Sequence, residues 1–139
     1  MDGYVDPTKE QFGKFKELIS NSPIHMLNLV RVREQAAYPD CRKCSGRDAY
    51  RAYGRESRPI FERVGGRQFW LGEFELTLIG PADERWDFVF IAEYPNSAAF
   101  VEMLRDPAYR EAVKHRQAAV LESRLIRLKP GVAGKGFGE

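Results

Sequence analysis

The order of patterns in the second half of the chain constrains the fold most strongly. Two runs rich in aromatic and β-branched residues, Arg67–Ile79 and Trp86–Tyr94, are separated only by the short connection Gly80–Arg85. Strands joined by so short a connection pair as an antiparallel hairpin. After Tyr94 the apolar period changes from two to about 3.6, as in a helix, and a strand-like run, Ser123–Leu128, follows. The second half therefore predicts strand, strand, helix, strand.

The first half predicts a helix, a strand and a second helix. Asp6-Pro7 has the pattern of an N-cap followed by proline at the first helical position. Ile24–Arg33 is apolar on both sides, as in a central strand. Ser45 is a candidate cap for a helix that ends at Gly65-Gly66, and Pro59 inside this pattern predicts a kink or a break.

The complete order matches the split βαββαβ arrangement of ferredoxin-like domains, preceded by one additional helix. Asp106-Pro107 repeats the cap-plus-proline signal, so we expect the last helical stretch in two pieces, Ser97–Arg105 and Pro107–Leu121. The predicted class is α+β, with an antiparallel four-stranded sheet and helices on one face. We expect a single domain over residues 6–130 and a flexible tail over residues 131–139.

Composition narrows the functional classes. Of the 139 residues, 43% are hydrophobic and 30% are charged, and the lack of any long uncharged apolar run argues against a membrane span. The formal charge of +2 comes from basic residues spread along the chain, whereas nucleic-acid binding requires a concentrated basic face. The first residues lack the basic start and apolar stretch of a secretory signal, so we expect a cytoplasmic protein.

The predicted sheet leaves one face without helices. Phe88–Ile91 and Leu76–Ile79 are apolar on both sides of their strands, and a bare apolar sheet face is unfavourable in water. We therefore expect a homodimer in which two copies pack sheet against sheet.

The chain also resembles a known family. The residues that carry the resemblance are Met26–Arg33, Ala37–Pro39, Gly80-Pro81, Trp86-Asp87, Glu93–Pro95, Arg105–Tyr109, His115-Arg116 and Ser123–Ile126. Together they are similar to the family called domain of unknown function 1330, over nearly all of residues 6–130. That family resembles the dimeric α+β barrel superfamily, which includes cofactor-free monooxygenases, isomerases, chlorite dismutase-like haem proteins and proteins of no known activity. The resemblance implies a dimeric α+β barrel and selects no reaction.

Five polar residues in the predicted elements are candidate site residues. His115 can move protons near neutral pH and Arg116 beside it can hold an anion, although a histidine on a helix surface is the commoner case. Asn28 interrupts an apolar strand, so either a neighbouring side chain satisfies its amide or it faces a ligand cavity. Tyr53 could offer its hydroxyl to a ligand or simply pack in the core. Arg31 lies near a strand end, where the alternatives are solvent and anion binding.

The remaining candidates are weaker. Glu73 shares a strand face with Glu75, which predicts the rim of a dimer or the lining of a polar pocket. Trp86 is expected to begin the third strand and to pack at the dimer border. His25 is expected to be wet, at the beginning of a strand. Cys41-Arg42-Lys43-Cys44 has CxxC spacing but lacks the further ligands of a zinc site, so we interpret both as incidental thiols.

These observations leave two functional hypotheses. The first is a homodimer that binds a small organic molecule, with an anion as one alternative, in a pocket between sheet and helices. Cofactor-free monooxygenase- or isomerase-like chemistry would then use His115, Asn28 and Tyr53, with Arg31, Arg116, Glu73 and Trp86 at the substrate. The second is a noncatalytic dimeric module that binds a ligand or stabilises an assembly. We expect no metal or cofactor; haem on His115 is a third, weaker hypothesis.

Overall fold

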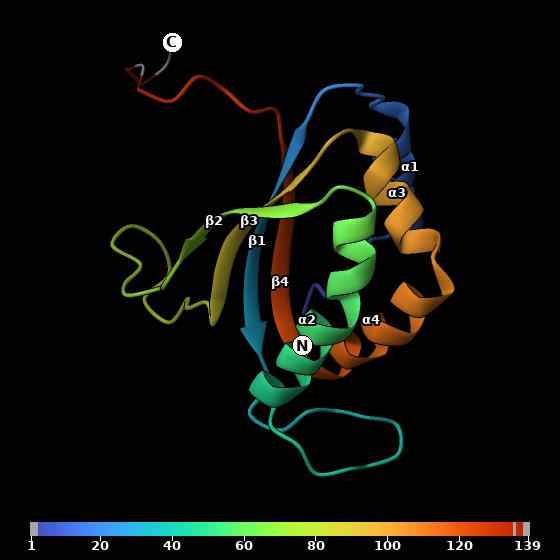
Figure 1. The fold of residues 1–139 in the computed structure, drawn as a ribbon. Coiled ribbons are helices and arrows are strands. Elements are labelled where there is room, and N and C mark those ends of the chain that lie inside the picture. The colour runs from blue at the N-terminus through green and yellow to red at the C-terminus, as the bar shows by residue number, and fades with distance from the viewer. Residues whose placement is uncertain (1–2, 135, 138–139) are drawn as a thin grey trace.

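The computed structural model describes residues 3–134 and 136–137 and shows a four-stranded antiparallel sheet with helices on one side (Figure 1). The strand order β2-β3-β1-β4 is that of the predicted ferredoxin-like class, which is confirmed. In chain order the elements are α1 Lys9–Glu17, β1 Ile24–Val32, α2 Gly46–Arg63, β2 Arg67–Gly72, β3 Phe88–Tyr94, α3 Ser97–Arg105, α4 Pro107–Ala119 and β4 Val120–Leu128.

Side-chain caps decide where the helices begin. Ser45 Oγ accepts a hydrogen bond from the Asp48 amide at 3.0 Å, so the predicted cap of α2 is confirmed. The predicted cap of α1 at Asp6 is wrong, because Thr8 Oγ1 accepts from the Gln11 amide at 3.1 Å and α1 begins only at Lys9. The break considered at Pro59 does not occur, since α2 continues through this exposed position.

The last helical stretch divides as predicted. Asp106 caps α4 by accepting from the Ala108 amide at 2.7 Å, and Pro107 occupies the first turn, where its missing N–H costs nothing. Helix α4 ends at Ala119, before the predicted Leu121. Strand β4 begins at Val120 instead of Ser123, because it continues the pairing with β1 past an irregularity in register.

The predicted hairpin is only partly right: β2 and β3 pair antiparallel as expected, but both strands are shorter than predicted. Strand β2 ends at Gly72 and β3 begins only at Phe88, so neither Leu76–Ile79 nor Trp86 belongs to the sheet. At the other end of this gap, the Asp87 amide donates to the Val30 carbonyl at 2.7 Å and the Asp87 carboxylate accepts from the Val32 amide at 2.8 Å. These bonds hold the chain before β3 to β1, while the pairing of β2 with β3 ends at Gly72.

Residues 73–86 form a long connection between the two strands, here the β2–β3 arm, which projects away from the sheet on the side without helices (Figure 1). The arm is folded back on itself: Thr77 Oγ1 donates to the Glu84 carbonyl at 2.9 Å, and the Glu84 amide donates to the Pro81 carbonyl at 3.2 Å. Several large apolar side chains of the arm are exposed, including Leu76, Leu78 and Ile79.

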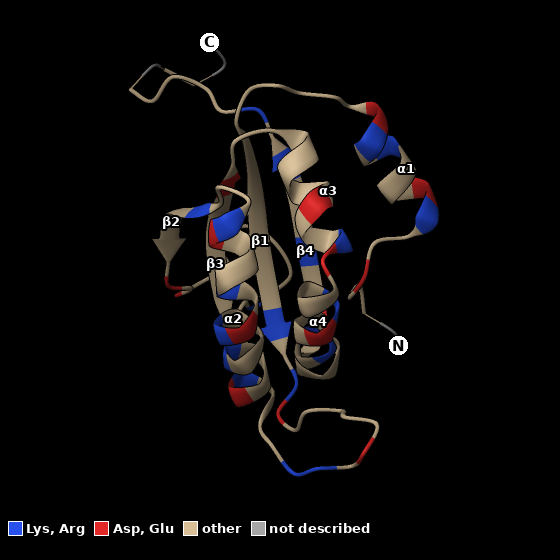
Figure 2. Ribbon diagram, turned by 45° about the vertical axis from the view of Figure 1, so that its right-hand side comes forward, with Lys and Arg blue, Asp and Glu red and all other residues tan. Residues whose placement is uncertain are grey.

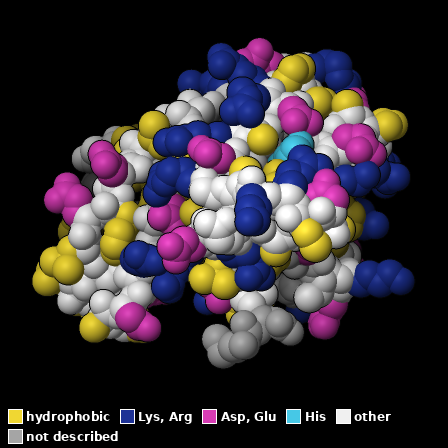
Figure 3. Space-filling view, turned by 90° about the horizontal axis from the view of Figure 1, so that it is seen from below, with side chains coloured by type: hydrophobic (Ala, Val, Ile, Leu, Met, Phe, Trp, Pro, Cys, Tyr) yellow, Lys and Arg dark blue, Asp and Glu magenta, His cyan; other side chains and the backbone are white. Residues whose placement is uncertain are grey.

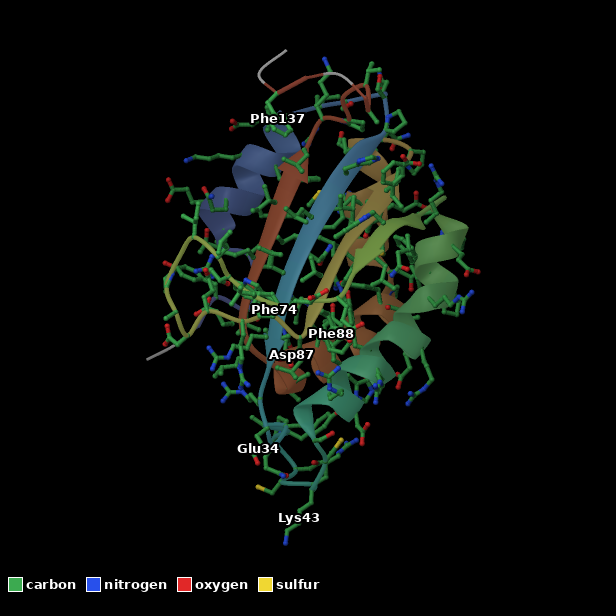
Figure 4. The ribbon with its side chains drawn as sticks, turned by 90° about the vertical axis from the view of Figure 1, so that its left-hand side faces the viewer. Glu34, Lys43, Phe74, Asp87, Phe88 and Phe137 are labelled. Carbon is green, nitrogen blue, oxygen red and sulfur yellow. The ribbon has the colours of Figure 1, made fainter. Side chains whose placement is uncertain are left out.

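The two faces of the sheet differ in how they are covered. Helices α2, α3 and α4 pack on one face around a core that includes Met26, Val30 and Tyr94. Helix α1 lies beside them: Phe15 packs against Phe100 of α3 in a tilted arrangement with ring centroids 4.9 Å apart. The opposite face, here the open face, carries Leu27, Ile91 and Ile126 side by side in register, with no helix over them (Figure 4).

Charged residues are distributed over all the helices, and basic residues also mark the last part of β1 (Figure 2). No helix within the described ranges is long and apolar enough to cross a membrane. Residues 131–134, 136 and 137 follow β4 without forming a helix or strand. Residues 135, 138 and 139 of the predicted tail lie outside the described residues. The domain limits at 6 and 130 and the flexibility of the tail stay predictions.

We predict that replacing Asp106 destabilises the protein in a pH-dependent way. The Ala108 amide, followed by Arg63, holds the pKa of the Asp106 carboxyl below its usual range. A lowered pKa in the folded state gives stabilisation that is present above the unfolded pKa of about 3.9 and is lost as the pH falls below it. Asp106→Ala should therefore lower the Tm at pH 7, and the difference from the wild type should shrink towards pH 3.

Ser45→Ala is the matched control, because Ser45 caps α2 without titrating. It should cost about 1 kcal/mol with no such pH dependence. Thermal unfolding followed by circular dichroism across this pH range measures both variants. If the Tm difference between Asp106→Ala and the wild type stayed constant down to pH 3, that result would contradict stabilisation by the ionised Asp106 carboxylate.

Candidate functional site

A large cavity of about 1540 Å³, here the main cavity, lies between the helices and the helix-covered face of the sheet. Its sheet side is lined by Met26, Asn28, Phe88, Phe90 and Ala92, and its helix side by residues that include Tyr50, Tyr53, Tyr109, Val113 and Arg116. The N-terminal segment and α1 contribute Val5, Phe12 and Phe15. Because most of these side chains are apolar or aromatic, its few polar groups decide what it can bind.

Arg116 is the buried cation of the main cavity. Its residue is 9% exposed. One terminal nitrogen donates to the Val5 carbonyl and the other donates to Ser123 Oγ at 3.3 Å. Both acceptors are neutral, and within the described part of the chain no carboxylate forms an ion pair with Arg116. Since buried charges in proteins are normally paired, the guanidinium is suited to an anion inside the cavity.

Tyr53 and Tyr109 join α2 to α4 through a hydrogen bond of 2.8 Å between their hydroxyl oxygens. Burial raises the pKa of the Tyr53 hydroxyl, and its hydrogen bond to Tyr109 and the nearby charge of Arg116 only partly oppose that effect. Burial also raises the pKa of Tyr50 and of Tyr109. These phenols therefore stay neutral at pH 7, where they act as hydrogen-bond donors and not as bases.

Asn28 lies on the sheet side of the same cavity. Its amide nitrogen donates to the Met26 carbonyl of its own strand at 3.0 Å. Its carboxamide oxygen accepts no hydrogen bond from the described residues, so it can accept one from a ligand. The partner of the amide is a backbone carbonyl and not the neighbouring side chain that the first alternative required, and the side chain also lines the main cavity, as in the second alternative.

His115 lies elsewhere. It lines a second, smaller cavity of about 440 Å³ together with Tyr38 and Glu56. His115 Nδ1 and the Tyr38 hydroxyl are 2.6 Å apart, and His115 Nε2 lies 2.8 Å from a carboxylate oxygen of Glu56. The structure thus brings Asn28, Tyr53 and Arg116 together and separates His115 from them. Both ring nitrogens of His115 are engaged, so neither is free to ligate haem iron.

The other sequence candidates lie on the opposite side of the sheet. Arg31 follows Leu27 and Leu29 on the open face, as strand alternation requires. Glu73, expected on a strand, is exposed at the beginning of the arm instead. Trp86 lies at the end of the arm, before β3, with its ring 6.0 Å from the Arg124 guanidinium. None of these three residues lines either of the two cavities.

Two further expectations concerned reactive side chains. His25 was expected to be wet and is buried instead, with Nε2 2.8 Å from Glu93 and its ring 4.2 Å from that of Phe69. Cys41 and Cys44 are both free thiols. Across residues 3–134 and 136–137, no cluster of three or more His, Cys, Asp or Glu residues could hold a metal ion.

Tyr109 and Ser123 are functional candidates that the sequence reasoning missed. Helical periodicity could have found Tyr109, because it precedes Arg116 by seven positions and therefore shares its helix face. His115, six positions after Tyr109, points about 120° away from Tyr109. Ser123 reaches the site by linking distant segments, since its hydroxyl donates to the Tyr4 carbonyl at 2.7 Å and accepts from Arg116. No local sequence signal reports such a contact.

We predict that Tyr53→Phe destabilises the protein by about 1 kcal/mol, because it leaves the buried Tyr109 hydroxyl without its partner. Tyr50→Phe is the matched control: Tyr50 also lines the main cavity, but its hydroxyl forms no hydrogen bond to the described residues. Urea denaturation of both single variants and of Tyr53→Phe/Tyr109→Phe measures the effect. If Tyr53→Phe and Tyr50→Phe lowered the free energy of unfolding equally, the hydrogen bond between Tyr53 and Tyr109 would not be stabilising.

Comparison with known proteins gives a family match. The model of the family described as domain of unknown function (DUF1330) matches residues 41–127. No curated protein matches the chain significantly.

Solved structures show close similarity to one uncharacterised bacterial protein. The chain is 66% identical to methylated RPA0582, with a TM-score of 0.95 and coverage of 97% of this chain and 100% of that one. A second structure of RPA0582, described as a protein of unknown function from Rhodopseudomonas palustris, is also 66% identical, with a TM-score of 0.91 and coverage of 94% and 98%.

A more distant similarity concerns the fold alone. A structure from Bacteriodes thetaiotaomicron, whose assignment as an antibiotic biosynthesis monooxygenase is provisional, is 17% identical, with a TM-score of 0.51 and coverage of 84% and 96%. At this identity only the shared architecture carries over.

Proposed function

The chain belongs to the family called domain of unknown function 1330, and we propose that it binds a small organic anion in its main cavity. The observation that carries the proposal is Arg116, a buried guanidinium with only neutral acceptors among the described residues. An anionic group at Arg116 would supply the missing countercharge.

The cavity lining favours a ligand with an apolar body. Phe88 and Phe90 on the sheet and Phe12 and Phe15 at α1 offer aromatic surface. The neutral hydroxyls of Tyr50 and Tyr53 could donate to a carbonyl or phenolic oxygen, and Asn28 could accept from a ligand hydroxyl. A few polar groups in an apolar cavity are typical of sites that orient one small molecule.

The same geometry favours binding over proton transfer in the main cavity. Its buried tyrosines are held neutral, and His115 lies in the second cavity.

A second candidate function is proton transfer in that smaller cavity. The hydrogen-bonded chain from Glu56 through His115 to Tyr38 supports it, because a carboxylate that orients an imidazole is a common arrangement for a general base. Monooxygenase- or isomerase-like chemistry stays a hypothesis for that site.

We also propose that two copies associate through their open faces. Leu27, Ile91 and Ile126 are neighbours in register near the middle of this face, and Trp70 lies beside Ile91 on the edge strand. Burying this apolar surface against a second copy would remove it from water. A cytoplasmic location stays a prediction.

A fluorescent anion tests the binding proposal. 1-Anilinonaphthalene-8-sulfonate combines an aromatic body with one negative charge, and N-phenyl-1-naphthylamine is its uncharged analogue. Arg116→Gln should weaken sulfonate binding roughly tenfold, which corresponds to about 1.4 kcal/mol, and change binding of the uncharged probe little. Fluorescence titration measures both affinities.

Arg110→Gln is the control, because Arg110 is an exposed arginine of the same helix that lines neither cavity. It should leave both affinities unchanged, and Arg116→Lys should retain part of the sulfonate binding. A folded Arg116→Gln protein that binds the sulfonate as tightly as the wild type would refute the proposal.

For the association, we expect Ile91→Asp to produce monomers, because a carboxylate at the middle of the packed faces would lose its hydration. Ile19→Asp is the control: Ile19 is an exposed isoleucine outside the sheet. Sedimentation equilibrium of the wild type and both variants measures the dimer dissociation constant. A wild type that is monomeric throughout, or a dimer indifferent to Ile91→Asp, would contradict association through this face.

A further inference from the structure

The β2–β3 arm exposes large apolar side chains to solvent, which is unfavourable unless another surface covers them. Leu78 is 84% exposed and Ile79 is 94% exposed, next to each other at the far end of the arm. The arm nevertheless has a defined shape, through its internal hydrogen bonds between Thr77, Glu84 and Pro81. A folded apolar projection of this kind is typical of an interaction surface.

The arm also carries unpaired negative charge. Glu73, Glu75 and Asp83 are exposed, and none forms an ion pair within the ranges that the structure describes. Hydrophobic and acidic side chains together cover the part of the molecule that projects at the left of Figure 3.

Positive charge without a partner lies at the same end of the sheet. The Nε atoms of Arg31 and Arg33 are buried and have no hydrogen-bond partner among the described residues, which is rare for buried polar atoms. Arg31 belongs to the last part of β1, where basic residues appear in Figure 2, and Arg33 follows directly after the strand. Asp87 binds Val30 and Val32 there, so the arm ends beside the arginines of its own chain, whereas it begins on the edge strand β2, which β3 separates from β1.

We propose that the arm docks on a second copy of this chain, so that Glu73 and Glu75 pair with Arg31 and Arg33 of that copy. The proposal rests on the association through open faces proposed above. A two-fold axis along the strands would keep the arm and the arginines at the same end of the assembly. It would also place the β2–β3 edge of one copy over the β1–β4 edge of the other.

Charge selects this arrangement over its alternatives. A two-fold axis across the strands would instead bring the arm to the opposite end of the second sheet, where β1 begins with His25 already paired to Glu93. Insertion of the arm into a membrane would place the acidic residues that flank Leu78 and Ile79 near lipid headgroups, which is unfavourable at an anionic surface. Arg31 and Arg33 would also remain unpaired.

Charge reversal with full-length chains tests the pairing. The arm variant carries Glu73→Lys and Glu75→Lys, and the strand variant carries Arg31→Glu and Arg33→Glu. Each variant alone places like charges together across the dimer, so each homodimer should dissociate roughly tenfold more readily. Mixing the two variants restores opposite charges at both contacts, so heterodimers should form in excess of random exchange.

Native mass spectrometry of the mixture, with one chain isotope-labelled, measures the proportions of the two homodimers and the heterodimer. Sedimentation equilibrium gives the dissociation constants. The control variant carries Glu10→Lys and Glu17→Lys on exposed positions of α1 and should exchange at random. If the strand variant does not fold, Leu78→Asp/Ile79→Asp in the exposed arm still tests docking, since it should weaken the dimer without changing the monomer's circular dichroism.

The outcomes separate the two proposals. A wild-type dimer that the arm variants leave unchanged, or random exchange between the arm and strand variants, would overturn docking of the arm and leave the sheet contact standing. A wild type that is monomeric throughout would overturn both. Sedimentation of the wild type with phosphatidylcholine vesicles, abolished by Leu78→Asp/Ile79→Asp while the dimer persists, would instead assign the arm to a membrane.

Discussion

The arrangement of the main cavity depends on the buried guanidinium of Arg116. Through Val5 it holds the N-terminal segment, and through Ser123 it connects α4 to β4. The Ser123 hydroxyl extends the network to Tyr4, so the chain before α1 is fastened beside the cavity by polar contacts. The same cation lies within electrostatic range of Tyr50, Tyr53 and Tyr109, and its charge partly opposes the rise in their pKa values. Arg116 therefore both holds the segments around the cavity together and is the residue proposed to bind the ligand.

Local signals in the sequence were sufficient to identify the helices, though not all of their ends, and the fold class. Ser45 and Asp106 cap helices as predicted because a side-chain oxygen close to free backbone amides is a local effect. The structure brings only some of the candidate site residues together, whereas adjacency in sequence had suggested that His115 and Arg116 act together. On a helix, neighbouring residues point in different directions, and these two side chains reach different cavities.

The hairpin was mispredicted for a non-local reason. Leu76–Ile79 has the composition of a strand, but a strand also needs a partner, and the pairing of β2 with β3 ends at Gly72. Hydrophobic pattern does not distinguish a residue buried within one chain from one reserved for an interface. The exposed arm therefore connects the failure of the prediction to the proposed docking on a second copy.

The most direct test of the central claim is a crystal structure of the protein with 1-anilinonaphthalene-8-sulfonate. The account predicts the naphthalene rings between Phe88, Phe90 and the helices, with a sulfonate oxygen about 3 Å from the Arg116 guanidinium. A probe bound in the main cavity with its sulfonate away from Arg116, or bound only on the open face, would contradict it.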